Sequence, residues 1–254
     1  MQNVKFHRAP LLAAAATAIA VLPLPRIGAA AAVSMNPVAD AFVSSANATN
    51  NYGAAGALDV AAAALPKGEF QSLMRFDLSA ARTSFDGQFG VGQWQVQSAT
   101  LQLTATTPNN PVFNTVAAGQ FSASWMQNDS WLEGTGSPNL PTSDGVTFST
   151  LPSFLSASDE ALGMFAFAGG TSGNNTYTLG LPGSFTADMT SGNNVSLRLF
   201  AADNAVSYVF DSRNFGTAGA RPLLTVNAIA IPEPTSVGLV VIAALAIGGI
   251  RKIR

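Results

Sequence analysis

Short apolar segments that alternate with polar residues constrain the fold of this sequence more than any other feature. In residues 195–200, for example, Val195, Leu197 and Leu199 fall on one face of an extended chain, whereas Arg198 points to the other face. No segment shows sustained helical amphipathicity, and the connections are dense in Gly, Asn, Ser, Thr and Pro. We therefore predict ten strands, near residues 40–44, 57–61, 72–78, 94–105, 120–126, 161–168, 176–181, 195–201, 206–211 and 222–227.

Ten strands without intervening helices predict an all-β fold, namely an antiparallel β-sandwich of jelly-roll type. Within 94–105 the apolar phase slips by one residue near Gln97 and Ser98. A β-bulge there, or two strand segments, would restore the alternation. Residues 107–119 and 132–160 are expected to be long loops.

The N-terminus has the order of a secretory signal peptide. Lys5 and Arg8 form a basic start, residues 11–24 are mostly apolar, and Ala30, Ala31 and Ala32 offer small residues for cleavage. The apolar stretch is too short to span a membrane, which takes about 20 residues. We predict a signal peptide over 1–32 with cleavage near Ala32, and a single sandwich domain over 33–230.

The C-terminus carries a second targeting pattern over 231–254. Pro232, Glu233 and Pro234 precede an apolar run at 237–250, and a basic cluster at 251–254 follows. This order predicts a C-terminal transmembrane helix whose basic end stays in the cytoplasm. It resembles the PEP-CTERM sorting signal. The resemblance implies that an exosortase in the inner membrane recognises the motif and cleaves near it, whereas a permanent anchor is the alternative.

Composition excludes several classes of function. Three of the twelve basic residues lie in each terminal segment, so the domain keeps six against 13 acidic residues, which disfavours a nucleic-acid partner. There is no cysteine, and the one histidine, His7, lies in the signal segment. An enzyme would therefore depend on carboxylates, Tyr, Lys or Ser. Neither Asp129 with Glu133 nor Asp159 with Glu160 has an identifiable catalytic partner, and we expect no enzyme.

Several segments of the domain carry a second resemblance, which extends over about residues 39–227. It rests on residues 39–44, 51–53, 58–60, 73–79, 96–103, 187–190, 210–214 and 221–226. The stretch 125–133, in which Trp and an acidic residue precede a loop, adds to it, whereas residues 132–172 match no pattern of that family. These segments resemble the DNRLRE-type domain, a family related to a carbohydrate-binding module described with alginate lyases. The resemblance implies a β-sandwich that binds polysaccharide.

Arginines are the most suggestive polar residues of the domain. Arg75 and Arg198 project from the polar faces of predicted strands, and Arg213 follows another strand. If the three converge, their planar guanidinium groups would suit the carboxylates of uronic-acid sugars. The alternative is a set of salt bridges with Asp77, Asp203 or Asp211. The net charge of −7 in the domain also opposes a polyanionic ligand at long range.

Aromatic side chains are the other candidates for sugar contact. Trp94 and Tyr208 alternate with core positions and are expected to be buried. Trp131, beside Asp129, Ser130 and the long loop, is the best candidate for an exposed stacking residue, although tryptophan is highly buried on average. We expect no cofactor. Asp188 and Asp211 are expected to bond local backbone, with calcium as the alternative.

The sequence thus predicts an exported, non-catalytic surface or matrix protein that binds extracellular polysaccharide. It would be held transiently in the inner membrane by its C-terminal helix and processed by an exosortase. The alternatives are a structural envelope or biofilm protein that acts by protein contact, and a carboxylate-dependent polysaccharide lyase or hydrolase.

Overall fold

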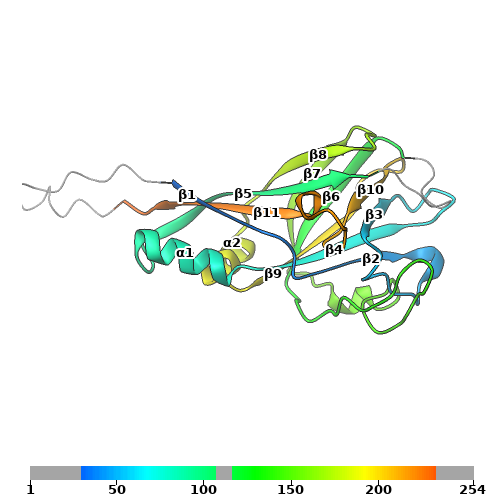
Figure 1. The fold of residues 1–254 in the computed structure, drawn as a ribbon, viewed down its shortest axis with the longest axis horizontal. Helices are drawn as coiled ribbons and strands as arrows, with labels where there is room; N and C mark the ends of the chain where they lie inside the picture. Colours follow the sequence, from blue (N-terminus) through cyan, green and yellow to red (C-terminus); the bar gives the residue numbers. More distant parts are fainter. Residues whose placement is uncertain (1–29, 107–115, 233–254) are drawn as a thin grey trace, which may run out of the picture. The chain divides into compact units, whose positions relative to one another are not determined.

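Eleven antiparallel strands form one continuous sheet that folds back on itself around a shared core. The computed structural model describes residues 30–106 and 116–232, and residues 28–231 form one compact unit. The strand order is β1-β11-β5-β10-β3-β4-β9-β6-β7, with β2 added beside β4 and β8 beside β5 (Figure 1). This confirms an antiparallel, β-sandwich-like fold, while the jelly-roll topology stays a prediction.

The sheet divides into two halves that we treat separately. The first half-sheet consists of β1 (Ala30–Met35), β11 (Leu223–Ala230), β5 (Trp94–Ala105) and β8 (Gly173–Leu179). The second half-sheet consists of β2 (Ala39–Ser44), β4 (Phe70–Asp77), β9 (Asn194–Ala201), β6 (Gly119–Met126) and β7 (Glu160–Phe167). β3 (Ala57–Ala61) and β10 (Ser207–Asp211) link the two halves.

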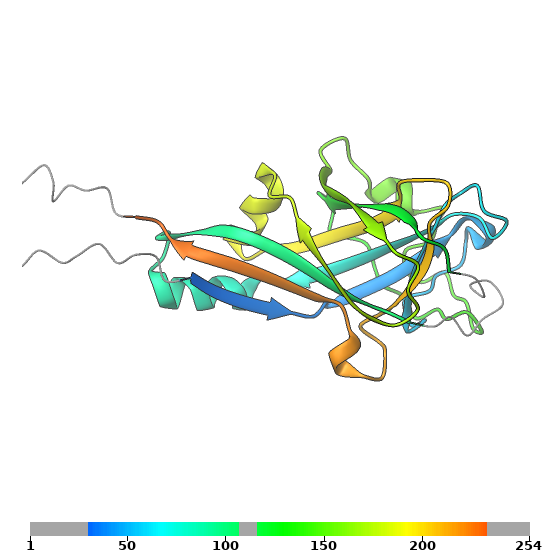
Figure 2. The same cartoon turned by 90° about the horizontal axis from the view of Figure 1, so that it is seen from above.

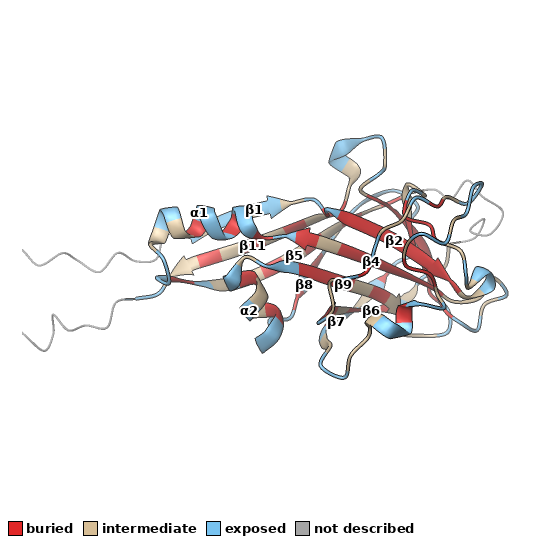
Figure 3. Cartoon of the chain, turned by 90° about the horizontal axis from the view of Figure 1, so that it is seen from below, coloured by how far each residue is buried: buried red, intermediate tan, exposed pale blue. Residues whose placement is uncertain are grey.

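The alternation read from the sequence sets which side chains form the core. Met74, Phe76, Leu197 and Leu199 of the second half-sheet are buried together with residues of the first half-sheet such as Leu101. Figure 3 shows in red that buried positions run along the strands. The predicted bulge in 94–105 is confirmed, because the register between β5 and β11 shifts from Asn227 opposite Ser98 to Ala228 opposite Val96.

Three elements were not predicted from the sequence. Strand β1 lies where the signal peptide was expected to end, and it pairs with β11 from Ala30 opposite Ile229 onwards. Helices α1 (Ser79–Phe89) and α2 (Gly183–Ser191) were missed because each buries only two side chains in the core. Figure 2 shows α1 at the end of the domain where β1 begins and β11 ends.

A carboxylate outside the helix caps the N-terminus of each helix. The Glu160 carboxylate accepts hydrogen bonds from the Ser184 and Phe185 amides at the start of α2, at 3.0 and 2.9 Å. The Asp77 carboxylate accepts one from the Ser79 amide at the start of α1. Such caps satisfy amides that have no partner within a helix.

The long loop that joins β6 to β7 covers part of the outer face of the second half-sheet. It contains the 3-10 helix η2 (Leu151–Phe154) and buries Trp131, Val146 and Leu151 against β2 and Leu73 of β4. In Figure 1 this green segment lies beneath β2 and β4. Two further 3-10 turns are η1 (Ser45–Asn47) and η3 (Ala218–Ala220).

Of the helices in the described part of the chain, none has the length and apolarity that crossing a membrane requires. The predicted transmembrane segment at 237–250, most of the predicted signal peptide and two residues of the sorting motif, Glu233 and Pro234, lie outside the described residues.

Candidate functional site

All three tryptophans and all three tyrosines of the chain are buried. Trp94, Trp125, Tyr52 and Tyr177 expose 8% of their surface or less. The prediction that Trp94 and Tyr208 belong to the core is confirmed, whereas the expected exposure of Trp131 is wrong, because this residue is 0% exposed. Its indole Nε1 donates a hydrogen bond to Ser196 Oγ at 2.9 Å beneath the long loop. A tryptophan or tyrosine that stacks on a sugar ring is therefore not available at the surface.

Arg75 holds the start of the long loop against β4. Its Nη1 donates hydrogen bonds to the carbonyls of Asp129 and Trp131 at 2.6 and 2.9 Å. The guanidinium carbon lies 5.1 Å from the centre of the Trp131 ring, within the range of a cation–π contact. These partners account for Arg75 as a residue that fixes the fold.

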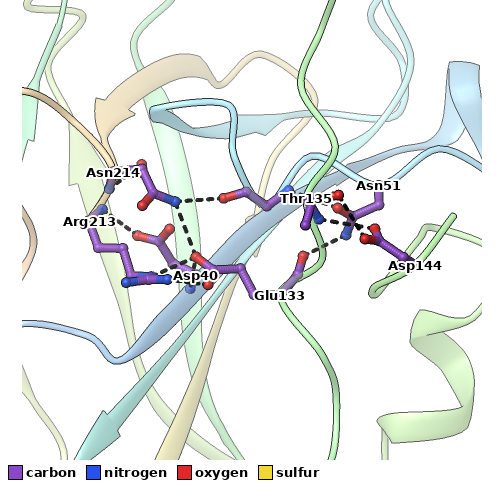
Figure 4. A network of polar contacts seen from close by, with 9 residues as sticks. Asp40, Asn51, Glu133, Thr135, Asp144, Arg213 and Asn214 are labelled. Atoms are coloured by element: carbon purple, nitrogen blue, oxygen red, sulfur yellow. Dashed lines mark hydrogen bonds and ion pairs between the residues drawn. The ribbon is translucent and has the colours of Figure 1, made fainter. Parts of the chain in front are cut away.

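Arg213 holds the same loop segment from the other side. Its Nε and Nη2 donate to the two carboxylate oxygens of Glu133, and the Nε bond measures 2.6 Å. The Glu133 side chain is 16% exposed and that of Arg213 33% exposed. Figure 4 shows Asp40 and Asn214 beside this pair: the Arg213 amide donates to Asp40 Oδ2, and Asn214 Nδ2 donates to Glu133 Oε1. Arg213 is thus engaged in a two-pronged, partly buried ion pair.

Asn51 fixes the long loop further along the chain. Its amide nitrogen donates to the carbonyls of Glu133 and Val146, and its oxygen accepts from the amides of Gly53 and Gly136. All four hydrogen-bonding positions of this buried side chain are therefore used. Gly136 has no room for a Cβ atom, which would lie 1.9 Å from the Asn51 carbonyl oxygen. The loop is a fixed cover on the sheet.

Arg198 differs from the other two candidate arginines because its hydrogen bond goes to the neighbouring strand β4 and not to the long loop. Its Nε donates to Gln71 Oε1 at 2.7 Å, and its guanidinium carbon lies 4.3 Å from the centre of the Phe200 ring. Gln71 is itself held, since its Nε2 donates to Glu69 Oε1. Within the described residues, neither Nη atom of Arg198 has a hydrogen bond or a carboxylate at ion-pair distance. The group is positioned but its two terminal nitrogens are unused.

The side chains around Arg198 lie on the part of the outer face that the loop leaves open. Residues directly opposite each other in an antiparallel ladder share a face. Arg198 faces Ser124 and Phe200 faces Ser122, which in turn faces Met164 of β7. Met164 is 60% exposed and the two serines are half-buried. We call these residues, with Gln71, the Arg198 face.

Burial shifts the pKa values of groups near both regions. Desolvation lowers the pKa of Arg198, while the charges of Glu69 and Asp159 act in the opposite direction. Desolvation raises the pKa of Asp40 to about 7, because it outweighs the hydrogen bond from the Arg213 amide. Asp40 belongs to β2 of the second half-sheet.

A metal site finds no support in the described part of the chain. No group of three or more His, Cys, Asp or Glu side chains is placed there to hold an ion. Asp188, one of the two residues for which calcium was the alternative, accepts hydrogen bonds from Trp125 Nε1 and Asn193 Nδ2. Asp211, the other, is buried at the end of β10 with Oδ1 unpaired.

The sequence profile of carbohydrate-binding module family 96 matches residues 31–158, which run from β1 to the end of the long loop. The chain belongs to this family. A search among curated proteins found no match. In this family 96 module, the matched part includes Gln71, Arg75, Trp131 and Glu133, whereas Arg198 and Arg213 lie beyond it.

The module thus brings Arg75 and Arg213 to one loop segment, 129–133, and leaves Arg198 on a separate, open surface. Sequence reasoning identified all three arginines but did not identify their partners. Gln71 could have been found, because its alternation with Leu73 and Arg75 puts it on the outer face. The partners of Arg75 and Arg213 come from a loop whose path has no periodic signal.

Proposed function

We propose that this family 96 module is a non-catalytic protein that binds uronate-containing polysaccharide on the Arg198 face. The observation that carries the proposal is the half-buried guanidinium of Arg198. Gln71 and Phe200 fix its orientation, and neither Nη atom bonds to any residue that the structure describes. Arg75 and Arg213 are not part of the proposed site, because their guanidinium groups bond to the loop segment 129–133.

The chemistry of the Arg198 face suits a sugar carboxylate. A planar guanidinium can bind a carboxylate through two parallel hydrogen bonds, and such charge-assisted bonds are roughly twice as strong as neutral ones. Ser122 and Ser124 add hydroxyl groups that can donate to or accept from sugar hydroxyls. Because the domain carries a net charge of −7, the attraction acts at contact range rather than by long-range steering.

Non-catalytic action is supported by the engagement of Glu133. Glu133, one of the two carboxylates closest to a glycosidase pair in the sequence, is held by Arg213, Asn214 and the Asp40 amide. A glycosidase needs one carboxyl group free to transfer a proton and a second free to act as nucleophile or base. Incubation with polysaccharide should therefore release neither reducing ends nor unsaturated uronate.

Calorimetric titration with uronate oligosaccharides tests the binding site. Arg198→Gln and Arg198→Lys should weaken binding by roughly 10-fold to 150-fold, since a charge-assisted hydrogen bond contributes about 1.5–3 kcal/mol. Lysine fails as well because an ammonium lacks the planar fork. Arg82→Gln, which removes an exposed arginine of α1, is the matched control and should leave affinity unchanged. Equal affinity of Arg198→Lys and the wild type would refute this site.

We propose further that the chain is exported and sorted to the cell surface or matrix. The support is the order of basic start, apolar run and alanines at 1–32 and of Pro232, Glu233, Pro234, apolar run and basic end at 231–254. An exosortase would then be its processing partner in the inner membrane. Glu233→Ala should leave a larger, membrane-retained form, and unchanged mass and release of that variant would refute sorting.

A further inference from the structure

The four strands of the first half-sheet carry no charged side chains on their outer face. The sequences of β1, β5, β8 and β11 contain no Asp, Glu, Lys or Arg. The side chains that point outward from these strands are instead mostly short hydroxyl or amide groups. We name six of them the hydroxyl-amide face: Ser34, Thr100, Gln102, Thr176, Thr178 and Thr225.

The register of the strands arranges these groups in rows. Ser34 of β1, Thr225 of β11, Thr100 of β5 and Thr178 of β8 lie directly opposite one another in successive strands. Neighbouring strands are about 4.8 Å apart, and residues of one face repeat about every 6.8 Å along a strand. The hydroxyl-amide face is therefore a lattice of two rows: four hydroxyls across the four strands, and the shorter row of Gln102 and Thr176 across β5 and β8.

A lateral hydrogen bond orients two members of the face, and two more such bonds join residues that border it. Ser34 Oγ and Thr225 Oγ1 are 2.8 Å apart. Asn227 Nδ2 donates to Ser98 Oγ at 2.9 Å, and Thr104 Oγ1 donates to Asn174 Oδ1 at 2.8 Å, at the two ends of the lattice. A hydroxyl has one donor and two acceptor positions, so each bonded hydroxyl retains capacity toward solvent.

Of the described elements outside the first half-sheet, none buries side chains against this face. The side chains that α1 and α2 bury, among them Phe85 and Phe185, belong to the core on the inner side of the sheet. The strands β1, β11 and β5 are seen side by side in Figure 2. Thr176, Thr178 and Ser34 are exposed, and the other three members of the face are half-buried.

We propose that the hydroxyl-amide face is a second glycan-binding surface, which takes a neutral, hydroxyl-rich polysaccharide lying across the strands. The proposal rests on the proposed function in so far as the chain is a carbohydrate-binding protein, but it uses none of the residues of the Arg198 face. A lattice of uncharged donors and acceptors is complementary to sugar hydroxyls. It offers nothing to a polyanion, which requires cations.

The composition of the face disfavours a protein partner. The cores of protein–protein interfaces are enriched in aromatic residues, Met and Arg, and are depleted in Ser. The hydroxyl-amide face contains none of the enriched types. Each neutral hydrogen bond adds about 0.5–1.5 kcal/mol net, so affinity arises only from many contacts along an extended chain. Long or insoluble glucans are therefore the appropriate ligands.

Binding isotherms on swollen amorphous cellulose and on insoluble β-1,3-glucan test the proposal. The triple variant Thr100→Val, Thr176→Val, Thr178→Val removes three hydroxyls but keeps side-chain shape and β-branching. It should lower apparent affinity for at least one glucan by about fivefold or more, while titration with uronate oligosaccharides is unchanged. Unaltered urea unfolding verifies that the variant is folded. Thr49→Val, at an exposed threonine outside the four strands, is the matched control.

The outcomes separate this proposal from the first one. Arg198→Gln should lose uronate binding and keep glucan binding, which is the opposite of the triple variant. Equal glucan binding by the triple variant and the wild type would overturn the proposal. Absence of wild-type binding to both glucans would also overturn it, whether or not uronate binding persists. A concentration-dependent dimer that the triple variant alone abolishes would assign the face to a second copy of the chain instead.

Discussion

The outer faces of the two half-sheets differ in their charge and in how much of each face is exposed to solvent. The first half-sheet presents short uncharged groups and lies open. The second half-sheet carries Arg75 and Arg198 on its outer face, and a loop of about thirty residues covers the strand that holds Arg75. Charged groups beneath a cover need specific partners. The comparison indicates that stability depends on ionisation and on single side chains in the second half-sheet but not in the first.

The largest expected difference is in the response to pH. Burial raises the pKa of Asp59, on linking strand β3, to about 8, although the charge of Lys67 opposes the shift, and raises that of Asp40 to about 7. Both carboxyls bind their proton more tightly in the folded state. Their contribution to the free energy of unfolding is therefore complete below about pH 4 and is lost as pH rises through 7 to 8. The free energy of unfolding should change by several kcal/mol over this range, because a shift of one pKa unit corresponds to about 1.4 kcal/mol.

Urea unfolding between pH 5 and 8.5 measures this effect. The Asp40→Asn variant in the second half-sheet and the Asp59→Asn variant in linking strand β3, whose new side chains cannot ionise, should each show a flatter dependence on pH than the wild type. The carboxyls whose pKa is lowered, such as Asp144 and Asp203, change protonation below this window. Parallel pH curves for either variant and the wild type would contradict the prediction.

Removal of the buried indole of Trp131 should produce the next largest effect. Trp131→Ala leaves a cavity beneath the loop and removes both the bond to Ser196 and the contact with Arg75, at an expected cost of about 3–5 kcal/mol. Trp131→Phe keeps most of the packing and should cost less. Val91→Ala, at a position that is 75% exposed, is the control. Chemical unfolding measures all three, and a loss below about 1 kcal/mol for Trp131→Ala would show that the loop cover contributes little.

A smaller loss is expected for the ion pair at the loop. Glu133→Gln keeps an acceptor for Asn214 but removes the charge that holds Arg213. Because a third of the Arg213 side chain is exposed, we expect about 1–2 kcal/mol, below the range for fully buried pairs. Arg82→Gln breaks the exposed Arg82–Asp86 pair and should change stability by less than about 0.5 kcal/mol in the same urea unfolding assay. Equal effects of the two variants would remove the distinction between covered and open charge pairs.

The smallest expected effect concerns the open edge of the first half-sheet. Cleavage after Ala32 would remove three of the six residues of β1 that pair with β11. A chain that starts at Val33 should be about 1 kcal/mol less stable than one that starts at Gly28, since only edge hydrogen bonds are lost. We therefore expect the mature N-terminus to lie at or before Ala30. Intact-mass measurement of the exported protein locates it, and a terminus at Val33 with full stability would contradict this expectation.

Much of the strand pattern could be predicted because alternation is a local signal. All ten predicted strands correspond to strands of the structure, and even the bulge near Gln97 was visible as a slip in phase. The helices could not be found in this way. The start of α2 is stabilised by Glu160, 24 positions before Ser184, so its own sequence carries little evidence of a cap.

The candidate site was predictable only in part, for a related reason. Outward projection of Arg75 and Arg198 follows from alternation, but whether a loop covers them depends on contacts between distant segments. Asn51 reaches Val146 across 95 positions, and Arg213 reaches Glu133 across 80. The residue pattern within one segment does not predict contacts over such distances in the sequence. The burial of Trp131 follows from the same cover and was missed with it.

The pairing of β1 with β11 has a consequence for the timing of folding. Ser34 and Thr225, which bond across this pair, are separated by 191 positions. The first strand of the domain therefore has no partner until the last strand has been made available. During synthesis, the β1 segment therefore stays unpaired until β11 has left the ribosome. Completion of the sheet is then the final event, and contacts so distant in sequence make it slow.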